Sequence, residues 1–192
     1  MQRQRGFTLI ELMVVLGIVA VLVTLAAPSF TKIIQGNTVA TTVNAFMSDL
    51  RFARSESIRL GGGVVMCRSN APEDAAPVCN SGAGPNSEGW ATGWIIFHDL
   101  DSDDARSAAE PLLRVQAAMT SVKSMTESKS TPTGTFRFTA TGRLRDVASA
   151  TEIKVGSSSL FTSDMQRLIC VSLGGRARIA GDGTAACGTN SL

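Results

Sequence analysis

A long apolar run near the start of the chain constrains the fold more than any other feature. Residues 12–27 contain one polar residue, Thr24, and no charged residue. Counted from Phe7 to Ala27 the run has 21 residues, close to the ~20 that a helix needs to cross a hydrocarbon core of about 30 Å. Arg3 and Arg5 precede it, and no basic residue follows until position 32. The positive-inside rule predicts a single-pass helix that starts in the cytoplasm, with the rest of the chain outside.

One carboxylate, Glu11, lies at the start of this helix. Two simpler interpretations compete: a secretory signal cleaved near Thr24-Leu25-Ala26, and a plain membrane anchor. Neither gives Glu11 a role, although a carboxylate inside an apolar span costs a few kcal/mol. A newly made α-amino group near Glu11 gives the carboxylate a role, because opposite charges attract strongly in a low dielectric.

The segment GFTLIEL at residues 6–12 resembles the class III signal of type IV pilins and type II secretion pseudopilins. The resemblance implies that a prepilin peptidase removes leader 1–6 by cutting between Gly6 and Phe7, and then methylates the amine of Phe7. It implies that Glu11 meets the amine of a neighbouring subunit during assembly on an inner-membrane platform. Pro28 matches the family's helix-bending proline, so residues 7–28 are expected to form the transmembrane and filament-core helix.

The same helix is expected to continue over residues 29–60, which contain no proline. Apolar residues recur there at spacings of three, four and seven, which predicts an amphipathic stripe facing a globular head. The three glycines at 61–63 predict its end, because glycine accepts the left-handed C-terminal cap. The stripe consists of Ile33, Ala40, Val43, Met47, Leu50 and Ala53.

The head, residues 61–192, reads as short strands separated by loops rich in Gly, Ser, Asn and Pro. The fold class is therefore α+β: a long helix, first hydrophobic and then amphipathic, packed on one antiparallel sheet or two packed sheets. Strands are expected at Val64–Arg68, Trp94–His98, Leu112–Gln116, 135–139, 152–155, 167–172 and 177–180.

Four cysteines in an exported domain indicate two disulfides. Three pairings are possible, and the local one, Cys67 with Cys79 and Cys170 with Cys187, is favoured because strands separate the two pairs. A catalytic cysteine is the alternative, but it needs a base, and no motif surrounds the one histidine, His98.

Two further segments are similar to the GspH/FimT group of minor pilins and pseudopilins. They are WATGWIIFHD at 90–99, which matches a W-x-x-G-W-x-x-F-x-D pattern, and FTATG at 138–142, which matches a later F-x-x-x-G turn. The resemblance implies a β-rich head, a minor rather than an abundant subunit, and a place at or near the filament tip.

Charge is unevenly distributed along a chain whose net charge is +2. Residues 69–112 hold eight acidic residues and one basic residue, whereas residues 132–192 hold seven basic and four acidic residues. Asp99, Asp101 and Asp103 alternate and Glu110 stands twelfth from Asp99, as in a calcium loop, but the sixth residue is Asp104 instead of glycine. A solvated acidic loop is the simpler interpretation, and no metal site is predicted.

Two segments of the form G-R-x-R occur in the basic part of the chain. On a strand, Arg176 and Arg178 share one face about 6.7 Å apart, a spacing that lets two guanidiniums contact phosphates of one nucleic-acid strand. This segment resembles the C-terminal element implicated in DNA binding by FimT-type members; Arg143 and Arg145 match it less well by position. Solvated charges that protect an edge strand are the alternative.

The sequence thus predicts a structural subunit with no cofactor and no catalytic residues, since no nucleophile–base set or phosphate loop is visible. Its partners are other pilins or pseudopilins, prepilin peptidase, the membrane and, in the alternative, DNA. Its location is the inner membrane, with a periplasmic head, and then the filament. Pilus and secretion system are not distinguished, and a secreted calcium-dependent hydrolase is the remaining rival.

Overall fold

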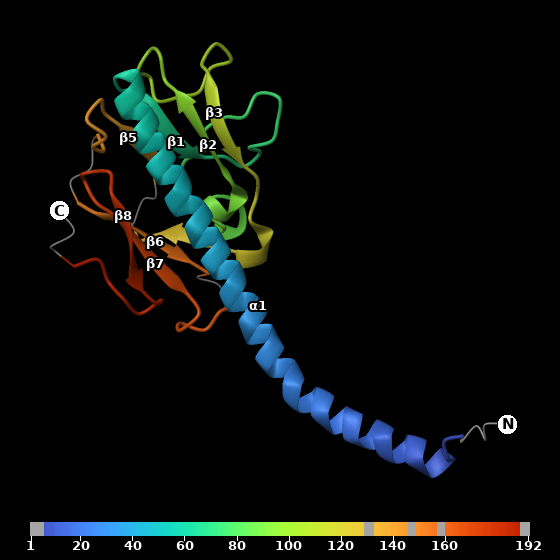
Figure 1. Ribbon diagram of the computed structural model, residues 1–192. Helices are drawn as coiled ribbons and strands as arrows, with labels where there is room; N and C mark the ends of the chain where they lie inside the picture. Colours follow the sequence, from blue (N-terminus) through green and yellow to red (C-terminus); the bar gives the residue numbers. More distant parts are fainter. Residues whose placement is uncertain (1–5, 129–132, 146–148, 157–159, 189–192) are drawn as a thin grey trace. The chain divides into compact units, whose positions relative to one another are not determined.

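The computed structural model describes residues 6–128, 133–145, 149–156 and 160–188, without the side chains of 26–29. In these residues one long helix, α1 (Leu9–Leu60), is followed by eight strands and three short 3-10 helices. The chain divides into two compact units, Met1–Asn37 and Thr38–Leu192, and α1 belongs to both. Figure 1 shows the chain from its N-terminus to its C-terminus.

Helix α1 has 52 residues and continues without a break through Pro28. It ends where the glycines predict: Gly61 has φ 80°, and the N–H of Gly62 donates to the carbonyl of Ser57 at 2.7 Å. This six-to-one bond is the Schellman arrangement, which satisfies carbonyls left over at a helix end.

Two antiparallel four-stranded sheets follow the helix in the second unit. The first has the order β3-β2-β1-β5 and the second the order β4-β6-β7-β8. The strands are β1 (Val64–Arg68), β2 (Trp94–His98), β3 (Leu112–Gln116), β4 (Met125–Glu127), β5 (Thr135–Phe138), β6 (Thr151–Val155), β7 (Arg167–Val171) and β8 (Ala177–Gly181). The 3-10 turns are η1 (Pro85–Ser87), η2 (Trp90–Thr92) and η3 (Thr120–Val122).

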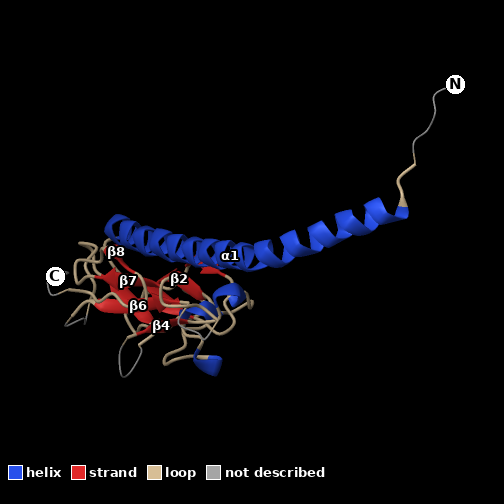
Figure 2. Ribbon diagram, turned by 90° about the horizontal axis from the view of Figure 1, so that it is seen from below, coloured by secondary structure: helices blue, strands red, loops and turns tan. Residues whose placement is uncertain are grey.

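The C-terminal part of α1 lies across one face of these sheets, as Figure 2 shows. One core joins the helix and both sheets, because buried side chains of the helix, of the first sheet and of the second sheet belong to a single cluster. At its centre the ring of Phe46 makes edge contacts with Trp90, Trp94 and Phe136 at centroid distances of 5.3, 5.2 and 6.2 Å. Aromatic pairs favour this geometry because the ring edge is positive and the ring face negative.

The predicted α+β fold with a long helix is confirmed, and of the two sheet arrangements the structure has two sheets. Three strand predictions match residue for residue, and four differ by one residue at one end. The three-residue strand β4 was missed.

The predicted helix stripe is partly wrong. Ile33 is 56% exposed and Ala40 is also exposed, whereas Val39 and Phe46 are buried. Ile33 precedes Val39, the first described position of the helix that is buried, and the predicted Ala40 is one residue past it. The other four stripe residues are buried as expected.

Candidate functional sites

The first candidate site is the start of α1. The side-chain oxygen of Thr8 accepts a hydrogen bond from the N–H of Glu11 at 3.3 Å, and the N–H of Leu12 donates to the carbonyl of Thr8 at 3.2 Å. Thr8 is therefore the helix N-cap and Glu11 is the third helical residue, the spacing of a capping box. The Glu11 carboxylate is exposed and has no partner among the described residues.

The helix that follows is apolar and uncovered. By length and composition α1 is the one helix in the described chain that could cross a membrane. Its large apolar side chains from Phe7 to Leu25 are about half to more than four-fifths exposed. Within the described residues nothing covers this segment, so only lipid or other chains can shield it from water. Arg3 and Arg5, and the side chain of Pro28, lie outside what the structure describes.

The two tryptophans of the W-x-x-G-W segment are core residues that donate hydrogen bonds to buried acids. Trp94 Nε1 donates to Asp49 of α1 at 2.8 Å, and Trp90 Nε1 donates to Glu127 of β4 at 3.0 Å. Asp49 also accepts a 2.5 Å contact from the guanidinium of Arg114, which lies 3.9 Å from the Phe52 ring centroid. The W-x-x-G-W segment therefore connects β2 to α1 through Trp94, and the η2 turn to β4 through Trp90.

Neither buried acid was predicted from the sequence. Asp49 has a detectable signal, since a carboxylate stands inside the apolar stripe, next to Leu50. Glu127 has none, because it lies in the short strand that the pattern did not reveal. Besides Trp90 it accepts the N–H groups of Gly134 at 2.8 Å and Thr133 at 3.1 Å.

Both disulfides form, in the local pairing: Cys67 with Cys79 and Cys170 with Cys187. No thiol is left free, so the catalytic-cysteine alternative is wrong. Each bridge attaches a loop to the sheet face opposite the helix, where Cys67 packs with Val65, Ile95 and Phe97.

A buried arginine organises the first disulfide loop. The Arg68 guanidinium donates to the side chain of Asn70 at 2.5 Å, to that of Thr92 at 3.3 Å and to the carbonyl of Ser81 at 2.6 Å. Burial lowers the pKa of Arg68, and the charge of Glu127 partly offsets this effect. These bonds connect the loop to Thr92 of the η2 turn.

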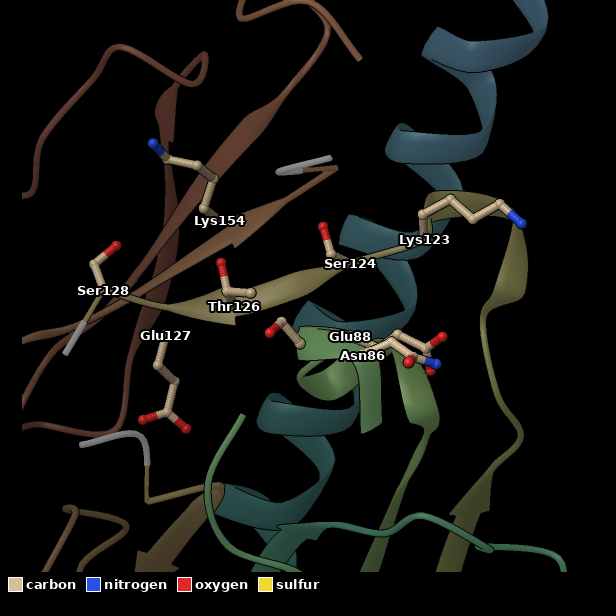
Figure 3. A pocket seen from close by; sticks show the side chains of 9 residues that line it. Asn86, Glu88, Lys123, Ser124, Thr126, Glu127, Ser128 and Lys154 are labelled. Atoms are coloured by element: carbon tan, nitrogen blue, oxygen red, sulfur yellow. The ribbon is translucent and has the colours of Figure 1, made fainter. Parts of the chain in front are cut away.

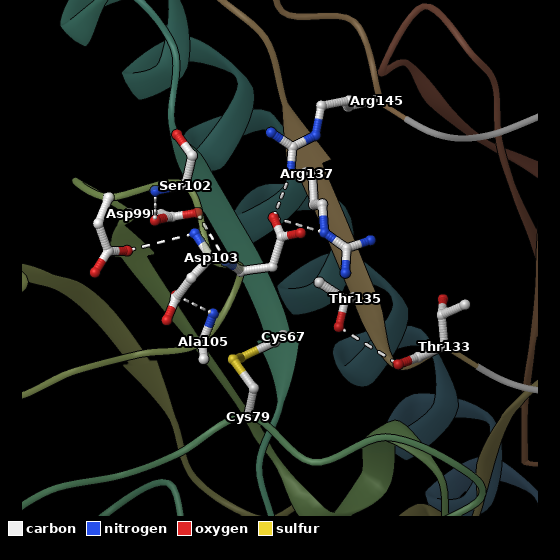
Figure 4. Close-up of polar contacts among 12 residues, drawn as sticks. Cys67, Cys79, Asp99, Ser102, Asp103, Ala105, Thr133, Thr135, Arg137 and Arg145 are labelled. Atoms are coloured by element: carbon white, nitrogen blue, oxygen red, sulfur yellow. Dashed lines mark hydrogen bonds and ion pairs between the residues drawn. A yellow bond between two sulfur atoms is a disulfide. The ribbon is translucent and has the colours of Figure 1, made fainter.

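The acidic loop after β2 is held by its own backbone (Figure 4). Asp99 accepts the N–H groups of Ser102 and Asp104 at 2.7 and 3.2 Å, and burial raises the pKa of Asp99 more than these bonds lower it. Carboxylate oxygens of Asp99, Asp101 and Asp103 lie within 4.8 Å of one another.

Glu110 and Asp104, the other acids of this loop, also have polar partners. Glu110 accepts the N–H groups of Leu100 at 2.9 Å and Ser107 at 2.7 Å. Burial by itself raises the pKa of Glu110, but these bonds outweigh it and hold the pKa below the usual range. Asp104 pairs with Arg137 at 2.7 Å and with Arg145 at 2.5 Å.

The structure brings the two G-R-x-R segments together. The N–H of Leu144 donates to the carbonyl of Leu173 at 2.9 Å. The carbonyl oxygen of Gly142 lies only 2.2 Å from where a Cβ would stand on Gly175. The side chains of Arg143, Arg176 and Arg178 are exposed on this joint surface. The guanidinium of Arg145 instead pairs with Asp104 of the acidic loop.

A polar cavity of about 630 Å³ lies beside β4 (Figure 3). Ser124, Thr126 and Ser128 line it from β4 and its ends, and Lys154 reaches it from β6. Its lining contains no histidine or cysteine, and its Glu127 is already bonded to three N–H groups. Glu88, Lys123 and Lys154 are the other charged residues of its lining.

Comparison with known proteins agrees with this arrangement. The family described as "Type II transport protein GspH" matches residues 42–175, most of the second unit. The chain belongs to this family. The prokaryotic N-terminal methylation motif matches residues 1–27, which include the Gly6–Glu11 segment. A GspH-family chain with this motif is a pilin-type structural subunit with an apolar anchoring helix.

One solved structure supports the fold. The type IV minor pilin FimU of Pseudomonas aeruginosa superposes with a TM-score of 0.52 at 17% identity, over 76% of this chain and 98% of FimU. At this identity the likeness concerns the fold. No curated protein resembles the chain closely enough in sequence to count as a relative.

Proposed function

We propose that the chain is a minor subunit of a type II secretion pseudopilus or a type IV pilus, processed between Gly6 and Phe7 and assembled through α1. The observation that carries the proposal is the uncovered apolar helix with one unpartnered carboxylate, Glu11, in its first turn. Before assembly the helix spans the inner membrane, with leader 1–6 cytoplasmic and the head, 61–192, periplasmic. In the filament the helices of neighbouring subunits cover one another.

Replacement of Glu11 tests this proposal in cells that carry the rest of the assembly system. Glu11→Ala is expected to leave cleavage at Phe7 intact and to remove the subunit from sheared filaments. Val15→Ala is the matched control, because it also shortens one side chain of the same helix without removing charge. Normal incorporation of the Glu11→Ala chain contradicts the assembly mechanism.

The mature N-terminus tests the class of protein. A methylated Phe7 supports the pilin proposal, and a start at Ala27 supports the secreted alternative. We expect the subunit at or near the filament tip, as the resemblance to minor subunits implies. Immunogold label confined to filament ends supports that position, and label along the whole length contradicts it.

The joint surface of Arg143, Arg176 and Arg178 favours a second function, binding of DNA through its phosphates. The three exposed guanidiniums, two at the start of β8 and one in the turn after β5, suit contacts with the DNA backbone, which carry no sequence preference and weaken with salt. Asp104 already occupies Arg145, so Arg145 is assigned to the loop instead of DNA.

Retention of mixed-sequence duplex DNA by the full chain in detergent micelles tests this second function. Arg176→Gln with Arg178→Gln is expected to weaken retention and to reduce the slope of log affinity against log salt by about two. Lys123→Gln, a single exposed cation on the η3 turn, is the control. Unchanged retention in the double variant removes the DNA function and leaves the filament function standing.

A further inference from the structure

Strand β8 is an edge strand whose outer backbone groups have no partner in the described chain. The N–H of Ser172 donates to the carbonyl of Arg176 at 2.8 Å, and the register pairs Cys170 with Arg178. In an antiparallel ladder, hydrogen-bonded and non-hydrogen-bonded pairs alternate. The N–H and C=O groups of Arg178 therefore point toward β7, and those of Ala177 and Ile179 point away from the sheet.

Two of the other three edges are occupied. On β5, the N–H of Arg145 donates to the carbonyl of Arg137 and the N–H of Thr139 to the carbonyl of Arg143, both at 2.8 Å. On β4, the N–H of Met125 donates to the carbonyl of Glu88 at 2.9 Å. The remaining edge, β3, has its one charged side chain, Arg114, engaged with Asp49.

The side chains of β8 define what fits beside it. Arg176 and Arg178 lie on the sheet face opposite the core, because Arg178 pairs with Cys170 while Ile169 and Val171 of β7 face the core. On the core side, Ile179 is 48% exposed at the margin of the sheet. A partner strand therefore meets positive charge on one face and an apolar surface on the other.

We propose that β8 binds an extended segment of another subunit, one with acidic residues alternating with apolar ones, as a fifth strand of the second sheet. Main-chain hydrogen bonds to Ala177 and Ile179 supply affinity, and alternate side chains supply specificity, as in other cases of strand addition. The two arginines also repel a second copy of β8, since like charges opposite one another destabilise a strand pair. They thus prevent self-pairing and favour an acidic partner.

A peptide of about nine residues with alternating glutamate and valine is the probe, and the full chain in detergent micelles is the target. Hydrogen–deuterium exchange of the segment around Ala177 and Ile179 is the readout. We expect these two amides to exchange quickly in the free chain and at least about tenfold more slowly with the peptide, because each gains a main-chain bond. The proposal is overturned if the Ala177 and Ile179 amides are already protected from exchange in the free chain, or if the peptide does not protect them.

Two variants separate strand addition from other binding. Ile179→Pro removes an outward N–H without breaking a bond to β7, and it is expected to abolish peptide protection; Ile179→Val, which keeps the N–H, is the control. Arg176→Glu with Arg178→Glu is expected to reverse the preference about tenfold toward a lysine–valine peptide. Equal binding by Ile179→Pro, or no change of preference on charge reversal, contradicts the proposal. DNA retention depends on the arginine side chains and is expected to survive Ile179→Pro.

Discussion

The buried carboxylate of Asp49 gives the sharpest test of how the helix is held to the head. It accepts the indole N–H of Trp94, which is fully buried, and a contact from Arg114, whose side chain is 39% exposed. These two interactions differ in expected strength. A buried donor left unpaired costs about 1–3 kcal/mol, whereas an ion pair with a partly exposed partner contributes about 0–1 kcal/mol.

Asp49→Ala removes both interactions and leaves a small cavity, so we expect the free energy of unfolding to fall by about 2–4 kcal/mol. Asp49→Asn keeps an acceptor for Trp94 and is expected to cost about 1 kcal/mol or less. Arg114→Gln is expected to cost more than Asp49→Asn, because it leaves the buried Asp49 carboxylate without its counter-charge, whereas Asp49→Asn removes the buried charge itself. Urea unfolding of the full chain in detergent, followed by tryptophan fluorescence, measures all three differences.

A double-mutant cycle isolates the indole bond. With Trp94→Phe in the background, the donor is gone and Asp49→Ala is expected to cost at least about 1 kcal/mol less than in the native chain. If Asp49→Ala and Asp49→Asn destabilise equally, or if the Trp94→Phe background leaves the cost of Asp49→Ala unchanged, the assignment of the stabilisation to this hydrogen bond is refuted.

Two further predictions concern the loops. Because hydrogen bonds from the loop backbone hold the pKa of Glu110 below the usual range, its ionised form stabilises the native state. The native chain is therefore expected to melt at a higher temperature than Glu110→Gln at about pH 7, and this difference should shrink as the pH falls through the glutamate range, about 4.3 and below. A difference that grows on acidification contradicts this sign. Gly175→Ala places a Cβ 2.2 Å from the carbonyl oxygen of Gly142 at φ 69°, and we expect the free energy of unfolding to fall by about 1–3 kcal/mol. Thermal melting measures the effect, with Gly188→Ala as the control because nothing lies within 4 Å of that position. Equal melting temperatures of the two variants refute the prediction.

Periodicity revealed most of the fold because most elements have a clear pattern. Strands such as Trp94–His98 and Leu112–Gln116 lie between glycine, proline or polar turns, and their ends could be placed correctly. Strand β4 was missed because three residues are too few to show alternation. It exists because β6 pairs with it and because Glu127 is bound by Trp90 and the turn before β5.

The sites were harder to predict because their residues meet only in the folded chain. Arg143 and Arg176 stand 33 positions apart in sequence, and their adjacency depends on the contact of Gly142 with Gly175. Arg143 and Arg145 look alike in sequence, yet Asp104 engages only the second of them. The acidic loop was predicted to be a solvated loop, but the sequence does not show that Glu110 is buried and binds the loop backbone.

In the proposed assembly, the apolar surface of α1 cannot by itself favour the filament over the membrane. Lipid tails are as apolar as leucine side chains, so exchanging lipid for neighbouring helices changes the hydrophobic free energy little. Glu11 changes the balance, because a carboxylate within the apolar span is costly, by up to roughly 2.5–3.5 kcal/mol at a helix centre on insertion scales, and in the filament it meets a cationic amine. Thr8 strengthens this preference, because its side chain already accepts one N–H of the first turn within the chain. Assembly must therefore supply a partner for the carboxylate alone.

A chain with Thr8→Val is therefore expected to be cleaved normally and to enter filaments less efficiently than the native chain, while retaining more incorporation than Glu11→Ala. Incorporation equal to that of Glu11→Ala contradicts this division of roles.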